Sequence, residues 1–171
     1  MLYVKNSYFL GVLAAIATVA IWAAFLVGTR FAVSGNLTVD EVIVLRLVPA
    51  FLIMLPLMLK LGVIIRGQSI FGLFMIALGA TAVFPYLIST GVYYAPASDA
   101  GALAAGMLPF WTALFAFTIT GEKPTKIRFL GLIIILIGAF LVGSYSILSS
   151  SGQNTWKGHF LFLAGSGMWS M

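Results

Sequence analysis

The chain has 171 residues, of which 62% are hydrophobic and only 8% are charged, and its formal net charge is +5. Soluble domains carry roughly 25% charged residues, and a soluble protein of this size has too little interior to hide so much apolar side chain from water. The composition therefore excludes an ordinary soluble domain and indicates an integral membrane protein. The basic residues are dispersed, which argues against nucleic-acid binding, and without cysteine there is no disulfide, thiol nucleophile or thiolate metal site.

A helix needs about 20 apolar residues to cross a bilayer, and apolar runs of about that length recur along the chain. They predict membrane-spanning helices at about residues 8–30, 42–59, 69–92, 99–120 and 129–148, with a sixth beginning at residue 158. A tight turn at Ala95-Pro96 is expected between the third and fourth spans. The predicted fold is an all-α, polytopic integral membrane protein.

The basic residues predict the orientation of these spans. If the spans alternate in direction, six basic residues share one side of the membrane: Lys5, Lys60, Arg66, Lys123, Lys126 and Arg128. Arg30 ends the first span and can extend its side chain to the opposite surface. Because basic residues favour the cytoplasmic side, we expect a multi-pass protein of the cell membrane with a cytoplasmic amino terminus.

Two stretches of the chain match each other in outline. Residues 11–22 read GVLAAIATVAIW and residues 158–169 read GHFLFLAGSGMW, so each runs from Gly to Trp over the same interval. If the second stretch opens a new copy after five spans, that copy enters the membrane from the opposite side. Such inverted repeats are used by many secondary transporters for alternating access.

The segment 93–143 resembles the end of an EamA-type domain of the drug/metabolite transporter superfamily. The likeness lies in a fourth span of small residues, then LPFWTALFA, then GEKPTKIRFLG, then a fifth span with spaced glycines. Earlier, IWAAFLVGTRF and VLRLVPAFLI are similar to the first two spans of such domains through Trp22, Phe25, Arg30 and Arg46. The resemblance covers about residues 8–145 and implies one half of a ten-helix transporter of small metabolites or drugs.

The resemblance also implies a domain organisation. Residues 1–148 would form the first five-helix repeat, 149–157 an extracytoplasmic linker, and 158–171 the start of a second repeat. The chain departs from the ten-span pattern because it stops after about five and a half spans. We therefore expect an incomplete product whose partner is the missing second repeat of the same chain, or a second copy as a homodimer.

Arg46 is the most informative single residue. A charge inside a span is costly and usually faces a cavity or a partner, so Arg46 is a candidate for binding an anionic group of the substrate. The alternative is that its side chain reaches the membrane surface or pairs with Asp40 or Glu41.

Two Pro–aromatic breaks are candidates for lining a cavity. Pro85 lies between Phe84 and Tyr86 in the third span, and Pro109 shortly precedes Trp111 in the fourth. A proline frees a carbonyl and bends a helix, which a bilayer tolerates against protein or a cavity. With Trp22, the aromatic residues Phe84, Tyr86 and Trp111 are the remaining substrate-binding candidates. The alternative for each is a lipid-facing or interfacial position.

Two carboxylates, Asp99 and Glu122, are candidates for coupling or gating. For Asp99 the alternative is a helix N-cap, through itself or Ser98, and for Glu122 it is an ion pair with Lys123, Lys126 or Arg128. Gly121 is expected to end the fourth helix in the left-handed conformation before Pro124. His159, the sole histidine, is expected at the interface without a metal-binding role, and no metal or other cofactor is expected.

These observations favour a secondary transporter, an exporter of small organic metabolites or drugs by alternating access, with the lipid bilayer and a small-molecule substrate as its partners. The alternative is a non-catalytic membrane subunit or a dimerising five-span protein. An integral-membrane enzyme is not expected, because no cluster of acids, histidines or cysteines gathers at one predicted interface.

Overall fold

The computed structural model describes residues 2–62, 67, 69–77, 79, 83–149 and 154–171. Its described helices are α1 (Leu2–Ser34), α2 (Val39–Leu61), α3 (Ile70–Ala77), α4 (Phe84–Tyr94), α5 (Ala97–Ala100), α6 (Leu108–Phe115), α7 (Lys126–Ser149) and α8 (Thr155–Ser170). Two π-helical turns, Gly101–Ala105 and Ala116–Thr120, follow α5 and α6. No strand is present in these described ranges.

Four stretches of helix are long and apolar enough to cross a membrane within the described part of the chain. They are Tyr8–Ser34, Val39–Leu61, Ala97–Thr120 and Lys126–Ser149, so helices of spanning length cover the first, second, fourth and fifth predicted spans. Two shorter helices, α3 and α4, lie within the third predicted span, and residues 78 and 80–82 between them lie outside the described part. At the predicted sixth span lies α8, a helix of 16 residues. A third and a sixth membrane crossing stay predictions.

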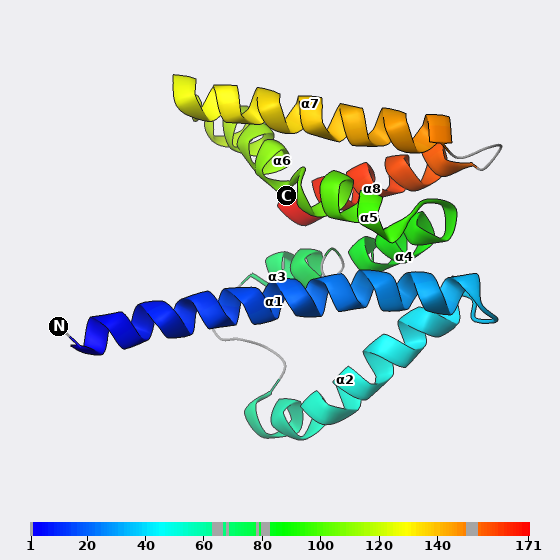
Figure 1. The fold of residues 1–171 in the computed structure, drawn as a ribbon. Coiled ribbons are helices and arrows are strands. Elements are labelled where there is room, and N and C mark those ends of the chain that lie inside the picture. Colours follow the sequence, from blue (N-terminus) through cyan, green and yellow to red (C-terminus); the bar gives the residue numbers. More distant parts are fainter. Residues whose placement is uncertain (1, 63–66, 68, 78, 80–82, 150–153) are drawn as a thin grey trace.

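The helices lie with their connections at two opposite ends (Figure 1). The amino terminus, the end of α2 and the start of α7 lie at one end, whereas the α1–α2 and α4–α5 connections and the end of α7 lie at the other. As a result α8 runs antiparallel to α1. The segments with Lys60 and with Lys123 to Arg128 therefore share the end at which the chain begins, as the charge pattern predicts.

Local sequence explains where the helices begin and end. Thr38 caps α2 by accepting from the Glu41 amide, while the Glu41 carboxylate accepts from the Thr38 amide at 2.7 Å, a reciprocal capping box. Gly121 ends the fourth span with φ of 73°, the left-handed conformation expected of it. Ala95 is extended before Pro96, so the expected turn between α4 and α5 is confirmed.

The contact between α4 and α8 organises the core. Gly91 and Gly158 lack side chains where the helices meet, so closely that a Cβ on Gly158 would lie 2.7 Å from the Gly91 carbonyl oxygen. A Cβ on Gly91 would lie 2.5 Å from the ring of Phe162, which is fully buried. Small residues let helices approach closely in lipid, and here they let α8 pack closely against α4.

Candidate functional site

Arg46 projects from α2 over an aromatic ring of α1. Its guanidinium carbon lies 4.0 Å from the centroid of the Phe25 ring, a cation–π contact. Among the described residues Arg46 forms no ion pair, and Glu41, the expected partner, is engaged by Thr38 instead. Pairing of Arg46 with Asp40 or Glu41 is therefore absent from this structure, and the alternative that its side chain reaches the membrane surface stays a prediction.

Three aromatic rings from three helices meet beside that contact. Trp22 of α1 lies 6.2 Å from Phe84 of α4, and Trp169 of α8 lies 4.7 Å from Phe84 and 6.3 Å from Trp22, centroid to centroid. Phe84 is buried, whereas Trp22 and Trp169 are partly exposed. Trp22 and Phe25 are three residues apart on α1, so the aromatic trio and Arg46 lie along one face.

Trp111 belongs to a separate aromatic group. Its ring stacks on Phe115 at 6.1 Å and meets Phe110 edge-on at 5.7 Å, and Gly167 of α8 leaves room beside it. The indole Nε1 of Trp111 is buried without a hydrogen-bond partner in the described part of the chain. The structure thus brings Trp22 and Phe84 together but keeps Trp111 apart from them.

The two proline candidates begin helices. Pro85 lies in the first turn of α4 and is fully buried, and Pro109 lies in the first turn of α6 and is exposed. At these positions the missing amide removes no hydrogen bond within the helix. Tyr86 is 48% exposed, so it points away from the packed core that holds its neighbour Phe84. A substrate-binding role for these residues stays a prediction.

A buried polar cluster joins α5, α7 and α8. The Oδ2 atom of Asp99 accepts a hydrogen bond from Ser146 Oγ and lies 2.8 Å from His159 Nε2, while Oδ1 accepts from Ser98 Oγ at 3.3 Å. Asp99, Ser146 and His159 are all buried. Sequence reasoning proposed Asp99 as a coupling residue but missed its partners, because His159 is 60 residues away in the chain.

One interpretation weighed for this cluster is wrong. Asp99 does not cap α5: the N-cap residue is Pro96, and no side chain caps that helix. The expected position of His159 at the membrane interface stays a prediction, but the residue is 6% exposed and paired with Asp99, a partner that the sequence did not indicate. The physical reason is the close α4–α8 packing, which carries the first turn of α8 inward against α5.

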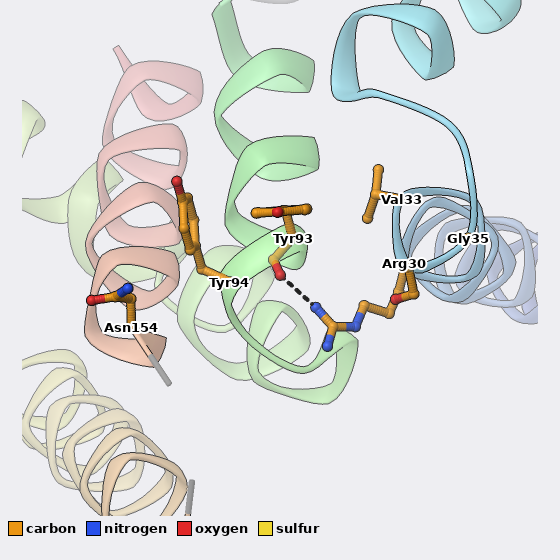
Figure 2. Close-up of a pocket in the computed structure, with 7 residues that line it drawn as sticks. Arg30, Val33, Gly35, Tyr93, Tyr94 and Asn154 are labelled. Atoms are coloured by element: carbon orange, nitrogen blue, oxygen red, sulfur yellow. Dashed lines mark hydrogen bonds between the residues drawn. The ribbon is translucent and has the colours of Figure 1, made fainter. Parts of the chain in front are cut away.

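Arg30 joins α1 to the end of α4 instead of extending freely to the surface. Its Nη1 donates to the carbonyls of Val92, Tyr93 and Ala95, with the Tyr93 contact at 2.8 Å (Figure 2). These carbonyls end a helix and carry partial negative charge that a cation stabilises. Arg30 also lines an open pocket of about 600 Å³, which Tyr93, Tyr94 and Asn154 share.

Glu122 follows the left-handed Gly121 and is exposed. Among the described residues it forms no ion pair with Lys123, Lys126 or Arg128, so the pairing expected for it is absent from this structure. Its backbone amide instead donates to the Ala116 carbonyl, closing the end of the fourth span. A gating role for Glu122 stays a prediction.

The fold and these contacts define a multi-pass membrane protein of packed apolar helices with a few buried polar groups. Residues 9–144 match the model of the EamA-like transporter family, which covers most of the chain. The chain therefore belongs to the EamA-like transporter family, whose domain is that of the drug/metabolite transporter superfamily, as the resemblance implied. Searches of curated proteins and of solved structures found no match.

Proposed function

We propose that the chain is the first five-helix repeat, with the opening of an inverted second repeat, of a secondary transporter that exports small organic metabolites or drugs by alternating access. The observation that carries this proposal is the contact between Trp22 and Trp169, whose ring centroids are 6.3 Å apart. The two residues occupy the same position in the Gly-to-Trp match, and their helices run antiparallel (Figure 1).

A contact between equivalent residues is what a two-fold axis in the membrane plane produces. Where such an axis passes through a contact, each residue meets its own counterpart in the other repeat. Inverted repeats of transporters are related by an axis of this kind, and their substrates bind near the bilayer midplane at the repeat interface. The Trp22–Trp169 contact supports an axis close to the aromatic trio.

The substrate site proposed here is the surface formed by the aromatic trio, Phe25 and Arg46. Arg46 is exposed on the described chain, and its guanidinium has donors free for an anionic group such as a carboxylate. The rings of Trp22 and Trp169 offer flat apolar surface beside it. In the whole transporter the second repeat would cover this surface and complete the site, and the amino terminus would be cytoplasmic.

Transport is tested with the whole gene product reconstituted into lipid vesicles. Cells grown on an isotopically labelled carbon source supply a deproteinised cytosolic extract, which is added outside, and the vesicle contents are analysed by mass spectrometry. We expect at least one labelled organic solute to enter much faster than into protein-free vesicles. Entry no faster than into protein-free vesicles, for every labelled solute, would contradict the proposal.

A further inference from the structure

The Asp99 cluster differs from every other acidic position of the chain. The sequence has four carboxylates, and Asp99 alone is buried, since Asp40, Glu41 and Glu122 are exposed. A buried carboxylate persists only when it is paired and hydrogen-bonded, and Asp99 accepts from two serines and faces the imidazole. Capping and helix packing do not explain this arrangement.

We propose that Asp99 and His159, held by Ser146, form a proton-binding site that links solute movement to the proton gradient. This inference rests on the proposed transport function and deepens it by naming the coupling ion and its site. With a neutral imidazole the cluster carries one net negative charge, and with one more proton on the ring it is a neutral ion pair.

The carboxylate of Asp99 borders a groove at the surface of the described chain. This groove, of about 700 Å³ between α5 and α7, is lined by Asp99, Ser98, Tyr145, Ser146 and Ser149 together with the apolar side chains of Ala102, Leu141 and Val142. Its lining includes Pro96, in the α4–α5 turn, and Ser149, the last residue of α7. We assign the exchange of the proton to this groove, because Asp99 lines it.

The cluster also joins parts of the chain that alternating access would move. Asp99 and Ser146 belong to the first five spans, whereas His159 lies in the first turns of α8. The strength of the Asp99–His159 contact depends on the charge of both groups, so gaining or losing a proton changes how firmly α8 is held. Movement of α8 in turn exposes or encloses the pair, and this reciprocity is what coupling requires.

Among the described residues, no other charged group pairs with Asp99. The titratable groups on the packed elements nearby are Arg30 on α1, Tyr94 on α4, Tyr145 on α7 and Lys157 on α8. Arg30 is bound to backbone carbonyls, and Lys157 lies over the rings of Tyr94 and Trp156. In the described part of the chain, the ion pair of Asp99 is with His159.

The test uses the same reconstituted gene product and labelled extract, now with and without an imposed pH difference of about one unit. For one proton exchanged per solute molecule at zero membrane potential, one pH unit sustains about a tenfold concentration ratio across the membrane. We expect a transported solute to accumulate about tenfold in wild-type vesicles with the gradient. Asp99→Asn should bring the same solute only to a ratio of about one.

Asp40→Asn is the matched control, because it makes the same substitution at an exposed carboxylate near the same end of the bundle. It should keep the tenfold accumulation. If Asp99→Asn vesicles show no entry at all, His159→Gln is measured in its place, and its solute ratio should also be about one. A ratio near ten in the variant that is used would overturn the site. A wild-type ratio of one despite rapid entry would overturn proton coupling but leave transport standing, whereas no entry into wild-type vesicles would refute the transport function itself.

Discussion

Replacing Gly158 by alanine should loosen the contact between α4 and α8. The new Cβ would lie 2.5 Å from the Ala95 Cβ, 2.7 Å from the Gly91 carbonyl oxygen and 2.9 Å from the Ala95 amide nitrogen. Carbon atoms pack at about 3.5–4.0 Å, so the helices would have to separate by about 1 Å. Two of the three atoms belong to the backbone and cannot move aside as a flexible side chain could.

The loss in free energy of unfolding caused by Gly158→Ala is measured against a matched control. Overpacking a well-packed site costs about 1–3 kcal/mol. Alanine also gains about 1 kcal/mol of helix propensity over glycine, but Gly138→Ala makes the same gain on α7, where a Cβ would meet nothing within 4 Å. The difference between the two variants should therefore be about 1–3 kcal/mol in the free energy of unfolding.

Thermal unfolding of the purified gene product in detergent measures this difference. At about 2–4 °C per kcal/mol for a protein of this size, Gly158→Ala should melt about 2–12 °C below Gly138→Ala. Adding Ala95→Gly should recover only part of the loss, because the clashes with the backbone remain. Equal melting temperatures for the two single variants would refute the close α4–α8 packing.

Three further outcomes are expected. Thr38→Ala should lower the free energy of unfolding by about 0.5–2 kcal/mol, because it removes the α2 cap. Thr18→Ala, whose hydroxyl bonds only within α1, should change that free energy little, and equal losses in the two variants would argue against the cap. A double-mutant cycle of Trp22→Ala and Trp169→Ala should give a coupling energy of about 0.5–1.5 kcal/mol, and strict additivity would contradict their contact. A peptide tag on the amino terminus should be inaccessible to antibody outside intact cells, and labelling there would reverse the proposed orientation.

The long helices could be predicted because their signals are local. Residues 39–61 and 126–149 are apolar over the length of a bilayer, and Gly121 and Pro124 mark a stop that needs no tertiary contact. The turn at Ala95-Pro96 is also a local signal, because a proline disfavours the helical conformation of the residue before it. The third predicted span was harder, because its described residues form two shorter helices, α3 and α4, with Pro85 in the first turn of α4.

The Asp99–His159 pair could not be predicted in the same way. Its members are 60 residues apart, and they meet only because glycines at 91 and 158 let α8 pack against α4. Read locally, Asp99 after Ser98 favours a cap and His159 beside Lys157 favours an interface. The one distant relation that the sequence did contain was the Gly-to-Trp match, and it drew attention to Trp169 before any contact was known.

The initial rate of solute entry into vesicles carrying wild-type or Arg46→Ala gene product tests the central claim most directly. Losing a hydrogen bond to a charged group costs about 1.5–3 kcal/mol, so the account predicts entry of an anionic solute slowed about tenfold or more. Arg128→Ala, which removes an exposed arginine at the start of α7, should transport at the wild-type rate. Entry through Arg46→Ala as fast as through wild type would contradict a substrate site beside the aromatic trio.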